Sequence, residues 1–337
     1  MTNMADIIRR CILTLVCISL GIVGGMALWY GLKDMMTLRV VLLAAWVCFH
    51  GIIMVLTWKK SELARTWLCY GIILLGLVSW WGSIRPSNNR LWADDVSRTV
   101  TAEVNGDAVV LHNVRSFHWR TSTDYDIRWE DRRYDLAELE SVDLFLSTWG
   151  NPNIAHTLVS FGFRDGQHVV FSLEIRKEQG EAFSSVAGFF KQYEQALIAA
   201  DERDIIYTRT NIRKEDVTRY AVRLTPEQRK VLFLKYLARG NALASEPVFY
   251  NTLTANCTTV VFDMVRSIVP GLPLDRRILF SGLLPSYIFD VGGFGREATL
   301  EQLTGQGRIT KRAQDIQDIN DYSRIIRNVS PTERVTP

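Results

Sequence analysis

Three long uncharged stretches follow one another near the N-terminus, at residues 11–32, 40–58 and 66–84. Each approaches the roughly 20 residues that an α-helix needs to cross the hydrocarbon core of a bilayer. Tryptophan and tyrosine residues gather toward the ends of these stretches, where amphipathic rings settle at the level of the lipid headgroups. A single buried core helix does not explain three such stretches separated by short charged breaks. We therefore predict a membrane domain of three transmembrane helices in residues 1–84.

Basic residues in the short loops predict the orientation of these helices. The loop after the first stretch holds only Lys33 and Arg39. The opposite side of the membrane holds five basic residues: Arg9, Arg10, Lys59, Lys60 and Arg65. Because cytoplasmic loops carry the excess of Lys and Arg, the N-terminus is predicted to be cytoplasmic and everything after Ile84 to be exported. A cleaved signal peptide is disfavoured, since no small-x-small cleavage site follows the first stretch and two more stretches come after it.

The exported part is nearly neutral. Residues 1–84 hold seven of the 39 Lys and Arg residues and three of the 36 Asp and Glu residues, which leaves 32 basic and 33 acidic residues beyond them. A nucleic-acid-binding domain would be expected to carry a basic excess or stripe, so the charge balance argues against nucleic acid as a partner. We expect a polar linker at residues 85–98, one large domain at residues 99–328 and a disordered tail at residues 329–337.

Runs rich in β-branched and aromatic residues predict a β-sheet in the exported domain. They lie at residues 99–104, 108–119, 142–149, 154–163, 168–175, 205–209 and 217–224. The pair Asp165-Gly166 predicts a tight hairpin between the fourth and fifth runs. Thr225, Pro226 and Gln228 form a capping-box pattern that predicts a helix to about residue 243. A second helix is expected at residues 257–268, so the exported domain is predicted to be α+β.

Cys257 is the single cysteine of the exported domain, which therefore has no internal disulfide. It stands in the run Asn256-Cys257-Thr258-Thr259. Asn256 is a favoured N-cap residue, so Cys257 is predicted to lie in the first turn of the following helix. The helix dipole and the unpaired N–H groups there favour a thiolate, and the same N–H groups can face a developing oxyanion. Cys257 is thus a candidate nucleophile, with a buried inert thiol as the alternative.

His156 is the preferred candidate base, because a rigid strand can aim its imidazole at the start of a helix. The residue that orients His156 depends on the register of the hairpin. With a tight turn, His156 faces Ile175. With a one-residue bulge it faces Arg176, and Glu174 lies diagonally across on the same face. Glu174 is therefore expected to orient His156 only in the bulged register, and His168 remains the alternative.

The exported domain resembles two related groups of proteins. A histidine in a strand that leads into a hairpin, followed much later by Asn-Cys at a helix start, is similar to circularly permuted NlpC/P60 (papain-like) domains, the group that contains the lecithin retinol acyltransferases. More closely, residues 114–268 resemble the N-terminal periplasmic domain of the bacterial lipoprotein N-acyltransferase Lnb. The likeness is carried by residues 114–120, 134–136, 143–147, 156–157, 174–178 and 251–259. In layout the chain differs from Lnb, whose membrane helices follow the periplasmic domain.

The resemblance implies a permuted papain-like fold in a bacterial inner-membrane protein with a periplasmic domain. It also implies acyl transfer or hydrolysis, in which Cys257 attacks an ester, thioester or amide carbonyl and His156 takes and returns the proton. Asn256, Thr258 and Arg176 are the residues expected near the substrate or the oxyanion, although Arg176 is also expected to brace the polar core. No cofactor or metal is expected.

A membrane lipid or a lipoprotein is the expected substrate, because the three helices keep the exported domain close to the bilayer. Two alternatives stay open. One is a cell-wall peptidase or amidase of the same fold. The other is a membrane-tethered binding domain without enzymatic activity, in which Cys257 is simply buried.

Overall fold

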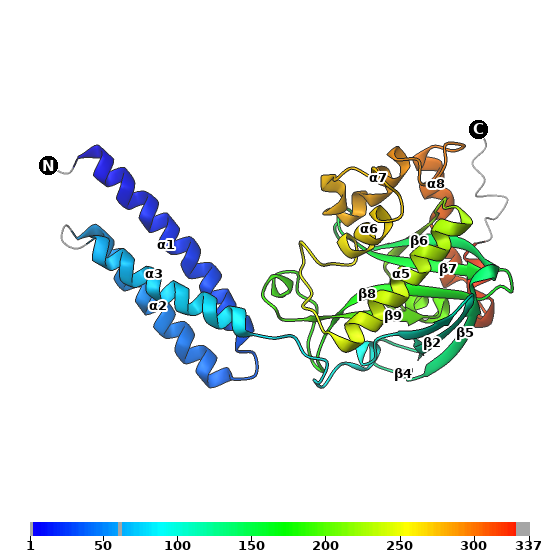
Figure 1. The fold of residues 1–337 in the computed structure, drawn as a ribbon, viewed down its shortest axis with the longest axis horizontal. Coiled ribbons are helices and arrows are strands. Elements are labelled where there is room, and N and C mark those ends of the chain that lie inside the picture. Colours follow the sequence, from blue (N-terminus) through cyan, green and yellow to red (C-terminus); the bar gives the residue numbers. More distant parts are fainter. Residues whose placement is uncertain (1–2, 60–62, 328–337) are drawn as a thin grey trace. The chain divides into compact units, whose positions relative to one another are not determined.

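The computed structural model describes residues 3–59 and 63–327, and the chain divides into two units. The first unit comprises Met1–Ser87 and Ser184–Tyr193. The second comprises Asn88–Phe183 and Glu194–Pro337. The tail predicted to be disordered, at residues 329–337, lies outside the described residues. Figure 1 shows the helices of the first unit and the mixed sheet of the second.

The first unit contains three helices that are long and apolar enough to cross a membrane, as the sequence predicts. They are α1 (Met4–Gly31), α2 (Met36–Trp58) and α3 (Leu63–Ser83). Close packing of α1 on α2 depends on small residues, since a Cβ at Gly24 would collide with the Trp46 ring. His50 of α2 bonds the Tyr70 hydroxyl of α3 at 3.0 Å, so this intramembrane histidine makes a helix-packing contact.

The second unit is built on an eight-stranded sheet with the order β1-β2-β9-β8-β7-β6-β10, with β5 pairing with β2. Its strands are β1 (Thr101–Asn105), β2 (Ala108–Arg115), β5 (Trp129–Asp135), β6 (Leu139–Thr148), β7 (Ala155–Phe163), β8 (His168–Arg176), β9 (Glu194–Ala200) and β10 (Asp216–Ala221). A separate small ribbon joins β3 (His118–Trp119) to β4 (Tyr125–Asp126). Most strand runs predicted from the sequence are therefore confirmed.

One predicted strand is wrong. Residues 205–209 belong instead to helix α4 (Glu202–Tyr207) and to the π-helical turn Thr208–Ile212 that follows it. The β-branched residues of this run face the sheet from a helix, as the full burial of Ile206 shows. Two strands of the sheet were not predicted from the sequence, β5 and β9. The Ala-rich run of β9 lacks β-branched enrichment but is buried along its whole length.

Helices cover both faces of the sheet. One face packs against α5 (Pro226–Ser245), α6 (Thr259–Arg266) and α7 (Leu284–Asp290), which contribute Phe233, Phe262 and Tyr287 to the larger core. Figure 1 shows α5 lying across the strands. The other face packs against α4, α9 (Thr310–Gln314) and α10 (Tyr322–Ile325), and α8 (Leu300–Gly307) lies next to β10. The result is a helix–sheet–helix sandwich.

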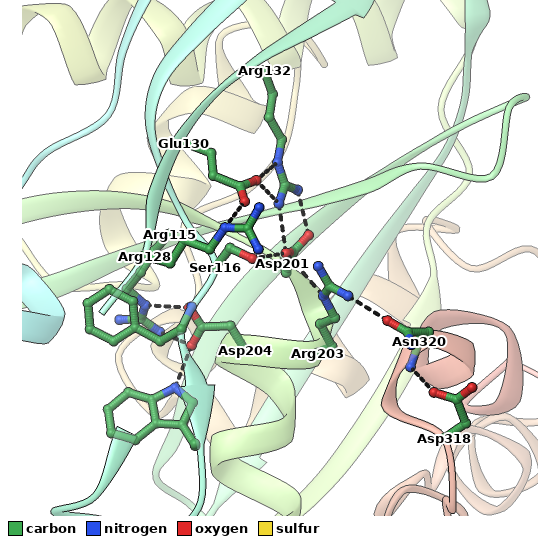
Figure 2. A network of polar contacts seen from close by, with 12 residues as sticks. Arg115, Ser116, Arg128, Glu130, Arg132, Asp201, Arg203, Asp204, Asp318 and Asn320 are labelled. Atoms are coloured by element: carbon green, nitrogen blue, oxygen red, sulfur yellow. Dashed lines mark hydrogen bonds and ion pairs between the residues drawn. The ribbon is translucent and has the colours of Figure 1, made fainter. Parts of the chain in front are cut away.

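Two buried aspartates, Asp201 just after β9 and Asp204 in α4, tie the strands to the helices (Figure 2). Asp204 is fully buried and accepts two hydrogen bonds from Arg115 of β2, one from the Phe117 N–H and one from the Trp119 indole. Asp201 accepts from Ser116, Arg132 and Arg203, and Arg203 also donates to Asn320. Because buried carboxylates are costly unless they are paired, this network holds α4 in a single position on the sheet.

Candidate active site

The β7–β8 hairpin sets the position of the candidate base. Phe163 and Gln167 pair across a three-residue loop in which Gly166 adopts a φ of 85°. Leu158 therefore lies opposite Ser172. Continued by two residues, this register places His156 directly opposite Glu174. Both predicted registers, the tight turn and the bulge, are wrong by one or two residues, because the Asp-Gly pair lies at the end of a longer loop.

His156 contacts two oxygen atoms of β8. Its Nε2 lies 2.7 Å from the Ser172 hydroxyl and 3.1 Å from Glu174 Oε1. The Ser172 hydroxyl donates to the same carboxylate oxygen at 2.7 Å. Since Nε2 is engaged with β8, the other ring nitrogen, Nδ1, is the one left for the thiol. The structure thus brings Glu174 to His156, but directly opposite it rather than diagonally across, and it adds Ser172 as a further contact.

Arg209 lies behind Glu174 and was not predicted as a site residue. Its guanidinium donates to Glu174 at 3.2 Å and to Glu215 at 3.1 Å, and Glu215 also accepts from Ser147. The side chain of Arg209 is 6% exposed, so this is a desolvated ion pair. No local signal pointed to Arg209, because its segment was predicted as a strand. Ser172 could have been found, since it lies two residues before Glu174 on the same strand face.

Cys257 lies in the turn just before α6, which begins at Thr259. The prediction that Cys257 belongs to the first helical turn is therefore wrong by two residues. The Asn256 side chain nevertheless caps the segment, because it accepts the N–H groups of Thr258 at 2.8 Å and of Thr259 at 2.9 Å. The Thr258 hydroxyl lies 3.0 Å from that of Thr157, which fixes the turn against β7.

The thiol of Cys257 and the imidazole of His156 shift each other's pKa. Burial raises the pKa of the Cys257 thiol, but the charge and hydrogen bond of His156, the Thr157 N–H and the Thr258 hydroxyl outweigh burial, and the net pKa lies below its ordinary value. Burial and the charge of Arg209 lower the pKa of His156, whereas the charges of Glu174 and Cys257 raise it, with a net result of about 9. Both shifts favour the thiolate–imidazolium pair over the neutral thiol and imidazole.

The carboxylate of Glu174 supplies a negative charge next to the His156 imidazole. Burial raises the pKa of Glu174, but the charge of His156 and the Arg209 guanidinium outweigh this effect, and the pKa lies well below its ordinary value. Glu174 is therefore ionised while it faces the imidazolium. The thiol, the imidazole and the carboxylate thus stand in the order that nucleophilic catalysis by a cysteine requires.

The hydrogen bonds around Cys257 restrict where an oxyanion can be held. The N–H groups of Thr258 and Thr259 are taken by Asn256, so they do not point at a substrate. The N–H of Cys257 has no partner within the described part of the chain. Among the three amides at this turn, the Cys257 N–H is thus the one that remains to bind an oxyanion. As for metals, no group of three or more His, Cys, Asp or Glu side chains within residues 3–59 and 63–327 is arranged to hold one.

Two predicted site residues lie elsewhere. His168 bonds the Gly166 carbonyl at 3.0 Å, and its pKa is lowered chiefly by burial. Arg176 donates to the carbonyls of Val96 and Ser97 and stacks over Trp92 at 4.7 Å. The structure does not bring either side chain to Cys257, and Arg176 braces the segment that leads into the sheet.

His168 offers a test of this assignment. Replacing His168 with Ala is expected to leave the alkylation rate of Cys257 unchanged at every pH, because the imidazole faces Gly166 rather than His156. The measurement is the rate of iodoacetamide labelling on the peptide that contains Cys257. A fall in that rate comparable to the effect of removing Glu174 would show that His168 orients the base instead.

Comparison with known proteins supports part of this picture. The comparisons found no match among curated proteins and none among solved structures. One family model matches residues 125–282, a stretch that contains His156, Glu174 and Cys257. Together with the three apolar helices, this match indicates a membrane protein with a periplasmic domain. The resemblance predicted from the sequence is thereby confirmed: residues 125–282 are similar to the family described as the Lnb N-terminal periplasmic domain.

Proposed function

We propose that this protein is a membrane-anchored periplasmic thiol enzyme that transfers or hydrolyses acyl groups of lipids or lipoproteins. The observation that carries the proposal is the series Cys257–His156–Glu174, in which the thiol pKa is lowered and the imidazole pKa is raised to about 9. Perturbed ionisable groups in mutual contact are typical of catalytic sites. The proposed location is a bacterial inner membrane with the N-terminus in the cytoplasm, and the domain at residues 99–328, behind the linker at residues 85–98, in the periplasm.

The chemistry would proceed in two steps. The Cys257 thiolate attacks the carbonyl carbon, a C–S bond forms, and the Cys257 N–H stabilises the oxyanion. As the C–O, C–S or C–N bond to the leaving group breaks, the His156 imidazolium protonates that group. An amine, alcohol or water then attacks the thioester carbonyl and gives its proton to His156. The C–S bond breaks, the acyl product leaves, and the released Cys257 thiolate with the His156 imidazolium regenerates the pair. Glu174 keeps the imidazole oriented and stabilises its positive charge.

The proposed fold class is a circularly permuted NlpC/P60-like domain. The order of the site residues supports this class, since the strand with His156 precedes the turn with Cys257, and a β-hairpin connects His156 to Glu174. A lipid substrate is favoured by the three membrane helices, which keep the domain beside the bilayer. A cell-wall peptidase or amidase of the same fold, and a non-enzymatic binding domain, remain the alternatives.

An acyl-enzyme trap tests the proposal. The full chain in phospholipid nanodiscs, incubated with a radiolabelled diacyl phospholipid or diacylated lipopeptide and quenched in acid, is expected to carry a hydroxylamine-labile acyl group on Cys257. The label should be lost in Cys257→Ala and kept in Cys69→Ser, since Cys69 is an exposed thiol of a membrane helix. Cleavage of cell-wall stem peptides without any lipid adduct would favour the peptidase. An unlabelled wild-type chain with no cleavage would leave the binding domain.

A further inference from the structure

The connection between β8 and β9 leaves the sheet unit and packs on the membrane helices. Residues Ser184–Tyr193 belong to the first unit together with α1, α2 and α3. The Phe190 ring stacks on Tyr30, with centroids 5.6 Å apart, and meets Trp81 edge-on at 6.2 Å. A loop between two strands of a sheet ordinarily lies over its own domain or in solvent. The β8–β9 connection instead packs its Phe190 ring against residues of the membrane helices.

Polar contacts fasten the same segment to the helix ends. Lys191 Nζ donates to the Trp81 carbonyl at 2.7 Å and to the Ile84 carbonyl at 3.2 Å, at the C-terminal end of α3. Lys33, just beyond the end of α1, donates to the Gln192 carbonyl at 3.3 Å. Cations are favoured at helix C-termini, where carbonyl groups lack intrahelical partners. The segment therefore lies at the ends where α1 finishes and α3 leaves the membrane.

These helix ends indicate the depth at which the segment lies. Tyr30, Trp80 and Trp81 stand in the last turns of α1 and α3. Trp and Tyr concentrate at the membrane–water boundary, where one part of the ring is apolar and the other is wet. Because Phe190 packs on Tyr30 and Trp81, the segment lies at the height of this boundary.

The segment also presents apolar side chains that the protein does not cover. Val186 is 44% exposed and Phe189 is 45% exposed, on either side of the buried residues Ala187 and Gly188. The short 3-10 turn Ala187–Phe189 holds Phe189 in place. Exposure of these apolar side chains to water is unfavourable in free energy. At the level of the lipid headgroups they would instead continue the apolar surface of the adjoining helices.

We propose that Ser184–Tyr193 is an interfacial membrane segment, in which Val186 and Phe189 insert between the lipid headgroups and the first part of the acyl chains. The leaflet is the one at the Gly31 and Ser83 ends of α1 and α3. β8, which carries Ser172 and Glu174, thus continues along the chain into a lipid-embedded segment before β9 returns to the sheet. This inference does not depend on the acyl chemistry of Cys257.

Depth-dependent fluorescence quenching tests the proposal in the full chain reconstituted in nanodiscs. A coumarin-bearing amino acid replaces Val186 or Phe189, both half-exposed positions that tolerate a larger side chain. The same label at Ile72, which is 62% exposed near the middle of α3, is the deep reference. Free coumarin in buffer is the aqueous reference, and lipids brominated at shallow or deep acyl positions are the membrane quenchers.

The expected result is that labels at residues 186 and 189 are quenched severalfold more by shallow-brominated than by deep-brominated lipids, and are largely protected from iodide. The label at residue 72 should show the opposite lipid preference. Iodide quenching at residues 186 and 189 as strong as that of free coumarin would overturn the proposal. Protection from both lipid and iodide quenchers would overturn it as well, because protein would then cover the segment.

Discussion

Alkylation of Cys257 by iodoacetamide is expected to persist well below pH 8 in the wild-type chain and to fall by about tenfold or more at pH 7 in His156→Ala. An ordinary thiol has a pKa of roughly 8.5. His156 supplies the main interactions that lower the pKa of Cys257, and without them burial, which raises that pKa, is left. Each unit of increase reduces the thiolate fraction at pH 7 by about a factor of ten. The adduct is quantified by mass spectrometry on the peptide containing Cys257.

The direction of the pH effect follows from the two shifted groups. The thiolate–imidazolium pair exists above the lowered pKa of Cys257 and below the pKa of about 9 of His156. Glu174→Gln removes a charge that raises the pKa of His156, so the alkaline limit of acyl transfer should move to lower pH. If the wild-type chain were labelled with the pH dependence of an ordinary thiol, and His156→Ala did not change that dependence, the catalytic interpretation would be wrong. Far-ultraviolet circular dichroism of both variants controls for folding.

Loss of the Asp204 carboxylate is expected to cause the largest loss of stability. Asp204→Ala leaves the Arg115 guanidinium buried without its partner and removes the acceptor of the Phe117 N–H and the Trp119 indole. Breaking a buried ion pair from one side costs about 3–5 kcal/mol. The measurement is urea unfolding of the full chain in detergent micelles, followed by tryptophan fluorescence.

Asp124→Ala is the matched control for that experiment. Asp124 pairs with Arg120 at the surface, where both side chains are largely exposed, and such pairs contribute little to stability. The control should therefore unfold at nearly the urea concentration of the wild-type chain. If Asp204→Ala did the same, the network of Figure 2 would not be what holds α4 on the sheet.

Local patterns were sufficient to predict much of this fold. The three membrane helices follow from uninterrupted apolar length, and α5 follows from a capping box that the structure contains at Thr225 and Gln228. β9 could not be predicted in this way. A central strand needs only burial, and its run Glu194–Ala200 has the composition of a helix. Ile205 and Ile206 led to the opposite error, a strand predicted where the structure has a helix. A short helix packed on a sheet also buries β-branched residues.

The residues of the candidate site also fall into two groups, those that a local sequence pattern indicates and those that only the tertiary structure reveals. Cys257 with its capping Asn256 is a local pattern, and His156 was found through the strand that bears it. The pairing of His156 with Glu174 depends on the length of the hairpin loop. The dipeptide Asp165-Gly166 is compatible with a two-residue and with a three-residue loop, so the sequence alone does not determine the register. Arg209 lies 35 residues after Glu174 in the sequence. Only the folded structure shows that its guanidinium bonds the Glu174 carboxylate and so adds a positive charge to the site.

Cys257 and His156 lie far apart in the sequence, and this separation has a consequence for the newly exported chain. Cys257 belongs to the core formed with α5 and α6, whereas His156 is held by Ser172 and Glu174 of β8. The two side chains meet only after the turn before α6 has packed on β7. Before then the thiol has an ordinary pKa and is mostly protonated at neutral pH. The shifted pKa of Cys257 is therefore a property of the folded domain, and the unfolded chain is expected to react with iodoacetamide as an ordinary thiol does.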